Sequence, residues 1–200
     1  LPYLLEIKSR GFTGFVDCTP AFLARDAKVS KKLSRASGVH IITNTGYYGA
    51  ANDKYLPAHA FTETSEQLAE RWIAEWENGI DDSGVFPGFI KTAVDPGKIS
   101  DIDKKLIQAA AITHLKTGLP IACHIGETKA AVEVMDLILN SGVDASALII
   151  VHAMGIDHNE LTKMAHAGAW LEFDGVSSDT IEQNVRIIKK MTDVGLLDRL

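Results

Sequence analysis

Three polar residues end otherwise apolar segments of this sequence, and their types suit metal chemistry. Lys91 closes the segment GFIKT, His124 lies in IACHI and His152 lies in IIVHA. The two histidines are about one structural repeat apart, so we expect them on neighbouring strands. Imidazole is a ligand for Zn²⁺, Mn²⁺ and Co²⁺. Each residue alone is more simply read as a satisfied polar group or a substrate-binding cation, but all three at the same level of successive strands predict a metal site.

The lysine supplies the negative charge that such a site needs. No Asp or Glu ends these three segments. A buried lysine is costly unless it is neutral or paired. Burial beside other cations lowers its pKa from the usual value of about 10.4 and makes the neutral amine available. A neutral amine adds CO₂ to form a carbamate, which resembles a carboxylate, so Lys91 is a candidate anionic ligand.

The elements that position these residues repeat along the chain. Short continuous apolar segments alternate with amphipathic stretches, which is the pattern of buried parallel strands joined by helices. The expected strands are residues 12–17, 39–44, 85–91, 119–124, 147–152 and 169–174. The expected helices begin at Thr64, Ser100, Thr128, Asp157 and Ser178, and a glycine follows each of the first four.

This repeat predicts a (β/α)8 TIM barrel. The strand starts are about 31 residues apart on average, which matches a barrel of about 250 residues divided by eight. A doubly wound open sheet is the alternative, but no GxGxxG follows any strand. Residues 1–10 are predicted to form a helix that follows a strand. Residues 191–200 are predicted to form a helix and a turn that lead toward a further strand. We therefore expect residues 1–200 to form one barrel domain that covers strands two to seven and lacks the first and last strands.

Composition limits the partners. The chain is 46% hydrophobic and 23% charged, which is typical of a globular domain. Its 20 basic and 26 acidic residues give a net charge of −6 without a basic cluster, which argues against nucleic acid. No apolar run approaches the ~20 residues of a membrane span. Cys18 and Cys123 form neither a disulfide framework nor a zinc motif. We expect a small-molecule substrate, with a second copy of the chain as the candidate protein partner.

The compartment is left open by the sequence. The chain begins without Met and without a charged or apolar leader segment. Cytoplasm is the default expectation, and a removed signal peptide is the alternative.

Several segments together resemble the phosphotriesterase-like branch of the amidohydrolase superfamily. They are GFTGFVDCT, ARD, SGVHIITNTGYY, GFIKT, TGLPIACHIGE, GVDASALIIVHA and AGAWLEFDG, in this order. The resemblance implies that Lys91 is carbamylated and bridges two divalent metals, zinc first and Mn or Co as alternatives. It implies that His124 and His152 bind the second metal. The family's His-x-His pair of strand one and Asp of strand eight are not in this sequence.

The same resemblance favours a lactonase. In phosphotriesterase itself an acidic pair follows the strand-six histidine and a histidine follows the strand-seven aspartate, whereas Gly155 and Gly175 stand at two of these places. We expect a hydroxide that bridges the two metals to open a lactone or related ester. Tyr47 and Tyr48 open a long polar loop over residues 47–61, and we expect both to bind substrate, with ordinary packing as the alternative.

Three other functions remain open from the residues. Phosphotriesterase activity is the first alternative. A Schiff-base aldolase with Lys91 as nucleophile is the second. A barrel that binds but does not catalyse is the third.

Three further predictions concern structure. Arg25 and Asp26 are expected to form an ion pair at a helix start. Trp72 and Trp76 share one helical face and are expected to pack against the barrel. The Cys123 side chain should point away from that of His124, because neighbouring residues in a strand face opposite sides.

Overall fold

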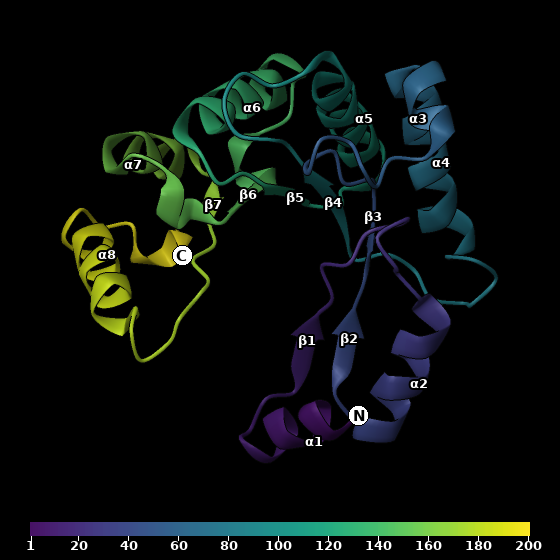
Figure 1. Ribbon diagram of the computed structural model, residues 1–200, viewed down its shortest axis with the longest axis horizontal. Coiled ribbons are helices and arrows are strands. Elements are labelled where there is room, and N and C mark those ends of the chain that lie inside the picture. Colours follow the sequence, from purple (N-terminus) through teal and green to yellow (C-terminus); the bar gives the residue numbers. More distant parts are fainter.

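The computed structural model describes residues 1–200 and has parallel strands that follow one another in chain order (Figure 1). Two sheets form, β1-β2 and β3-β4-β5-β6-β7, and every pairing is parallel. The strands are β1 (Gly14–Val16), β2 (His40–Ile42), β3 (Asn44–Thr45), β4 (Phe89–Ala93), β5 (Ile121–His124), β6 (Leu148–Val151) and β7 (Trp170–Leu171). The predicted parallel βα architecture is confirmed.

One expected strand is divided into two. Residues 39–44 were expected to be continuous, but only Thr43 separates β2 from β3. The first half pairs with β1 and the second half pairs with β4. The chain therefore changes partners at Thr43, and it joins the two sheets in a single arc whose end strands, β1 and β7, are not paired with each other.

The helices lie along the outer side of this arc (Figure 1). They are α1 (Pro2–Ser9), α2 (Ala27–Ser37), α3 (Ala58–Thr62), α4 (Ser65–Asn78), α5 (Asp101–Thr117), α6 (Thr128–Asn140), α7 (His158–Ala167) and α8 (Ile181–Asp193). Three short 3₁₀ turns cover Ala145–Ala147, Ala153–Gly155 and Leu197–Arg199. No helix combines the length and apolar character needed to cross a membrane.

Local capping explains where most helices begin. Thr64 and Ser100 each form a capping box, in which the side chain accepts the N–H of the third helical residue and that residue's side chain accepts the cap N–H. Asp157 caps α7 as expected. The helix α6 begins at Thr128 as predicted, with Glu127 as its cap, whereas α8 begins after Thr180 rather than at Ser178.

The core lies between the five-stranded sheet and α4 to α7. Its largest fully buried side chains include Leu68, Trp72, Ile90, Leu106, Ile121 and Ile150. Trp72 is 1% exposed, but Trp76 is 37% exposed, so only the first of the two tryptophans packs inward as predicted. Cys123 is buried in this core on the face of β5 opposite to His124, as predicted.

The predicted Arg25–Asp26 ion pair is wrong. Asp26 caps α2 by accepting the N–H of Val29 at 2.9 Å. Arg25 instead pairs with Glu75 of α4, donating to Oε2 at 2.8 Å, and its guanidinium also donates to the Asn44 carbonyl at 2.7 Å. These bonds fix the segment after β1 to β3 and α4.

Candidate metal centre

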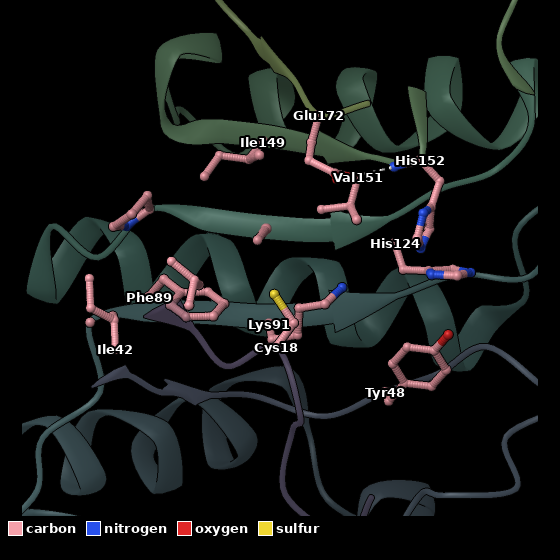
Figure 2. A pocket seen from close by; sticks show the side chains of 14 residues that line it. Cys18, Ile42, Tyr48, Phe89, Lys91, His124, Ile149, Val151, His152 and Glu172 are labelled. Carbon is pink, nitrogen blue, oxygen red and sulfur yellow. Dashed lines mark hydrogen bonds between the residues drawn. The ribbon is translucent and has the colours of Figure 1, made fainter. Parts of the chain in front are cut away.

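Lys91, His124 and His152 line one cavity of about 750 Å³ on the inner face of the sheet (Figure 2). They come from β4, from β5 and from the residue after β6. Parallel pairing places Lys91 opposite Ala122 and places His124 opposite Ala93 and Val151. Lys91 therefore lies two residues deeper than His124, so the prediction that all three residues stand at one level of the sheet is wrong for the lysine.

The Lys91 amine is buried without an acidic partner. Lys91 is 3% exposed, and its Nζ donates to the Thr92 carbonyl at 3.1 Å. No carboxylate lies within ion-pair distance. Burial lowers the pKa of Lys91, because desolvation penalises the charged form. The site thus favours the neutral amine that CO₂ addition requires.

The rings of His124 and His152 meet edge to face. Their centroids are 4.4 Å apart at an interplanar angle of 80°. Burial, followed by the neighbouring His152 and Lys91, lowers the pKa of His124 to about 4. His124 is therefore neutral near pH 7, which is the form that binds metals.

Two carboxylates that follow β7 hold His152. Asp174 Oδ2 lies 2.7 Å from Nδ1 of the ring, and Glu172 Oε2 accepts the backbone N–H of His152 at 3.0 Å. One ligand-type atom of each of the three residues lies within 4.8 Å of the others. His152 itself has φ 68° and ψ 42°, a left-handed conformation that is uncommon for a residue with a side chain.

Sequence reasoning missed the role of these carboxylates. The prediction considered only acids at the ends of the three strands that carry Lys91, His124 and His152, whereas Glu172 and Asp174 follow the next strand. The signal was the Glu-x-Asp spacing in LEFD, since residues two apart in an extended segment face the same side.

The two adjacent tyrosines point to opposite sides of the chain. Tyr48 lines the cavity, with its ring centroid 5.4 Å from that of His124 and 5.8 Å from Lys91 Nζ. Tyr47 is 5% exposed and lines a separate cavity of about 430 Å³. Its hydroxyl lies 2.9 Å from His59 Nε2, and burial raises the pKa of Tyr47 to about 12. The structure thus brings Tyr48, but not Tyr47, to the histidines.

The loop that follows Tyr48 is tied to the end of β4. Asp95 accepts the N–H groups of Ala51 and Asn52 at 2.8 and 2.9 Å. Ala51, Asn52 and Asp53 all have positive φ, so three successive residues are left-handed. Such a conformation persists only where surrounding contacts maintain it. The Asp95 carboxylate is one such contact, and it holds the loop close to the strand that carries Lys91.

Gly155 has a packing reason to be glycine. A Cβ built at this position would lie 2.3 Å from the carbonyl oxygen of Gly126. The segments after β5 and β6 therefore approach each other too closely for a side chain at residue 155. Gly175, with φ 64°, has more open surroundings, because a Cβ there would meet only Met154 Cε at 3.6 Å.

Comparison with known proteins gives a consistent picture. The sequence profile of the phosphotriesterase family matches residues 2–200. A phosphotriesterase homology protein of Escherichia coli (strain K12) is 28% identical over 200 residues, covering 98% of this chain and 68% of its own. The crystal structure of the Escherichia coli phosphotriesterase homology protein complexed with phosphate in the active site matches with a TM-score of 0.91 and 27% identity, covering 99% of this chain and 69% of that one.

Other relatives carry a different name. The N-acetyltaurine hydrolase of Homo sapiens is 26% identical over 213 residues, covering 98% of this chain and 60% of its own. That of Salmo salar is 31% identical over 181 residues, covering 89% and 51%. The chain thus spans between about half and about two thirds of the length of these relatives.

Proposed function

Because this chain belongs to the phosphotriesterase family, we propose that the intact protein is a metal-dependent hydrolase that opens lactones or related carbonyl esters. Members of this family typically have a binuclear metal centre. Lys91, His124 and His152 are the ligands that this chain contributes in the proposal. A His-x-His pair and an Asp from the rest of the intact protein complete the set by family resemblance.

The observation that carries the proposal is the convergence of these three residues on one cavity. They come from β4, from β5 and from the residue after β6, the two ring centroids are 4.4 Å apart, and the lysine is buried with no acidic partner. A purely structural lysine in such a place would be expected to have a counter-ion. Nitrogen donors of this kind fit zinc, manganese or cobalt.

The carbamate of Lys91 balances the charge of the centre. The neutral amine adds CO₂ to give an N-carboxylate and releases one proton. When bound, the metals supply Lewis-acid polarisation of the substrate carbonyl and generate a nucleophile from water near neutral pH. The residues of this chain orient the reactants: Asp174 holds the ring of His152, and Tyr48 presents a hydroxyl that can donate to a substrate oxygen (Figure 2).

The segments around the cavity favour a lactone over a phosphotriester. No acidic side chain occurs between His152 and Ile156, and Gly175 follows Asp174. The phosphotriesterase proton shuttle, as the resemblance defines it, is thus missing from this chain. Ring opening of a lactone leaves the new alkoxide on the same product, where it takes up one proton, so no separate leaving group has to be released.

Amide hydrolysis is the second candidate. Relatives of 26–31% identity are named N-acetyltaurine hydrolases, and an acetyl amide has a carbonyl that the same centre would attack. The amine leaving group is poorer than an alkoxide, so an amidase needs a proton donor near the leaving nitrogen. Tyr48 is the residue with a hydroxyl group among those that line the cavity, so it is the candidate proton donor.

A substrate panel tests the proposal. The metal-loaded intact protein is assayed with sugar lactones, acyl-homoserine lactones, N-acetyltaurine and paraoxon, and metal content is measured in the same preparation. The highest kcat/KM is expected for a lactone, with two metals per chain. A preference for paraoxon or N-acetyltaurine would replace the substrate assignment. Covalent trapping of a carbonyl substrate by borohydride would identify the aldolase alternative, because a carbamylated lysine cannot form an imine.

A further inference from the structure

We propose that Glu172 is a positioning residue for His152, a role that rests on the proposed function of His152 as a metal ligand. The Glu172 carboxylate accepts the His152 backbone N–H at 3.0 Å from the cavity side of the sheet (Figure 2). Glu172 fixes the backbone, Asp174 fixes the ring, and together they leave Nε2 as the ring nitrogen available to a metal.

The backbone of His152 needs such support. With φ 68° and ψ 42°, it is left-handed directly after β6. This conformation brings Cβ close to the following carbonyl and is unfavourable for residues other than glycine. A residue held this way beside a functional cavity depends on its surroundings to keep the geometry.

Glu172 binds the turn at three points. Its backbone N–H donates to the Ile150 carbonyl at 2.9 Å, and its carbonyl accepts the N–H of Ala153 at 2.9 Å. These two bonds flank His152, whose own N–H would otherwise have no partner from β7. The Glu172 side chain folds back to accept that N–H. Glu172 therefore makes three hydrogen bonds to the segment 150–153.

The two carboxylates have separate tasks. Asp174 Oδ2 lies 2.7 Å from Nδ1, so the ring presents its Nδ1–H to Asp174. Outer carboxylates of this kind orient ligating histidines and set their tautomer. The Asp174 contact controls rotation of the ring, but it holds only if Cα and Cβ of His152 stay in place. The position of these two atoms depends on the hydrogen bond from the His152 N–H to Glu172.

Direct metal ligation by Glu172 is the competing role. Its carboxylate lies within the group of three residues whose ligand-type atoms are within 4.8 Å of one another. A ligand and a positioning residue differ in what a substitution removes. Loss of a ligand lowers the number of metals bound at saturation, whereas loss of a positioning residue weakens affinity and disturbs the ring without changing that number.

The first measurement uses the metal-free intact protein. Long-range ¹⁵N–¹H correlation of labelled histidine reports the tautomer of His152 at a pH well above the pKa of free imidazole. The wild type and Glu172→Gln should show mainly the Nδ1–H form, because a carboxamide oxygen can still accept the backbone N–H. Glu172→Ala should show a mixture of tautomers. Glu160 of α7, whose half-buried side chain pairs with Lys163 at 2.7 Å, provides the charge-removal control, and Glu160→Gln should match the wild type.

The second measurement titrates the same proteins with Co²⁺ and records the visible spectrum. Glu172→Ala should bind Co²⁺ about 10- to 100-fold more weakly, the usual effect of losing an outer-shell partner. Its metal number at saturation should be unchanged, and Glu172→Gln should recover most of the affinity. The thermal transition of each variant checks that the fold is intact.

The outcomes separate the two proposals. If Glu172→Ala keeps a single tautomer and wild-type affinity, the positioning role is wrong. If Glu172→Gln loses one metal at saturation, Glu172 is a ligand and the positioning role is also wrong. If the wild type binds no divalent metal, the proposed function fails, and the tautomer measurement alone decides whether Glu172 positions His152.

Discussion

The five-stranded sheet β3–β7 and the two-stranded sheet β1–β2 are built from similar apolar segments, yet they differ sharply in burial. All five residues of β4 are buried, whereas all three residues of β1 are exposed. The covering helices differ in the same way, since α5 has seven buried residues and α1 has none. A continuous apolar segment therefore gives a strand the capacity to be buried, but the neighbours on both sides decide whether it is.

The cavity lies between these two regions. The five-stranded sheet contributes Lys91 and His124, and the β1 segment contributes Val16 and Cys18. Only the five-stranded sheet contributes nitrogen donors, and these lie on strands that are largely buried. We infer that the chemistry depends on the large sheet and that the small sheet mainly shapes the wall.

The largest effect should come from removing Lys91. Lys91→Ala should cost metal and lower activity by more than about 100-fold, since even outer-shell residues contribute 10- to 100-fold. Added formate or another short carboxylic acid should partly restore activity by replacing the carbamate. The matched substitution from the small sheet, Cys18→Ala, should change metal content little, because it removes only a wall atom.

Structure and metal analysis check this prediction. A crystal structure of the metal-loaded protein with an unmodified Lys91 amine would contradict the carbamate. Equal metal loss in Cys18→Ala would show that the small sheet also supplies a ligand.

The next effect concerns Arg25, which connects the segment after β1 to β3 and α4. The Arg25 side chain is 4% exposed, and it pairs with Glu75 of α4 while donating to the Asn44 carbonyl of β3. Removing one member of a buried pair leaves the other charge unpaired, so Arg25→Ala should lower the free energy of unfolding by about 3 kcal/mol. Denaturant unfolding of the intact protein measures this loss.

The exposed pair Arg71–Glu63 provides the control. The Arg71 side chain is 49% exposed, so Arg71→Ala should cost much less than Arg25→Ala. A double substitution that replaces both Arg25 and Glu75 by apolar residues should recover part of the lost stability, because it leaves no unpaired charge but removes the partners of the Asn44 carbonyl and the Thr45 hydroxyl. Equal losses for Arg25→Ala and Arg71→Ala would show that the Arg25–Glu75 pair contributes no more to stability than an exposed pair.

The sequence predicted features that depend on short-range spacing. The capping boxes at Thr64 and Ser100 involve residues three apart, and Asp157 caps α7 in the same local way. The parallel βα order also follows from local patterns of apolar segments and turns. The meeting of Lys91, His124 and His152 in one cavity was predictable because strand ends of a parallel sheet share one edge. Their ligation of a metal remains a prediction.

The features that were missed depend on long-range register and orientation. Arg25 reaches a partner 50 residues away, so its neighbour Asp26 was the wrong choice. The depth of Lys91 depends on how β4 is shifted against β5, which no local pattern encodes. Glu172 reaches the turn after β6 from the following strand, and a search confined to each histidine's own strand could not find it.

An effect of similar size should distinguish the cores of the two sheets. Ile90 of β4 is fully buried, and Phe15 of β1 is 45% exposed. Ile90→Ala should cost about 2–5 kcal/mol, because it removes buried methyl groups and leaves a cavity. Phe15→Ala should cost well under half of that. An equal loss in denaturant unfolding would show that another part of the intact protein covers β1.

The smallest effect should separate the two adjacent tyrosines. Tyr48 lines the cavity beside His124, and Tyr47 is buried on the other side with its hydroxyl 2.9 Å from His59 Nε2. One neutral hydrogen bond is worth about 0.5–1.5 kcal/mol. Tyr48→Phe should therefore lower kcat/KM by about 2- to 10-fold without changing the thermal transition. Tyr47→Phe should lower stability by about 1 kcal/mol and leave kcat/KM unchanged.

This pair tests orientation because the substitution is the same at both positions. Each variant loses one hydroxyl group and keeps the aromatic ring, so the T-shaped packing of Tyr47 against Phe22 and Trp72 survives. The contrast then depends only on which side of the chain each ring occupies. Kinetics on the best lactone of the panel and a melting curve are recorded for both variants. If Tyr47→Phe lowers kcat/KM while Tyr48→Phe does not, substrate approaches from the cavity beside His59, and the site beside Lys91 is misassigned.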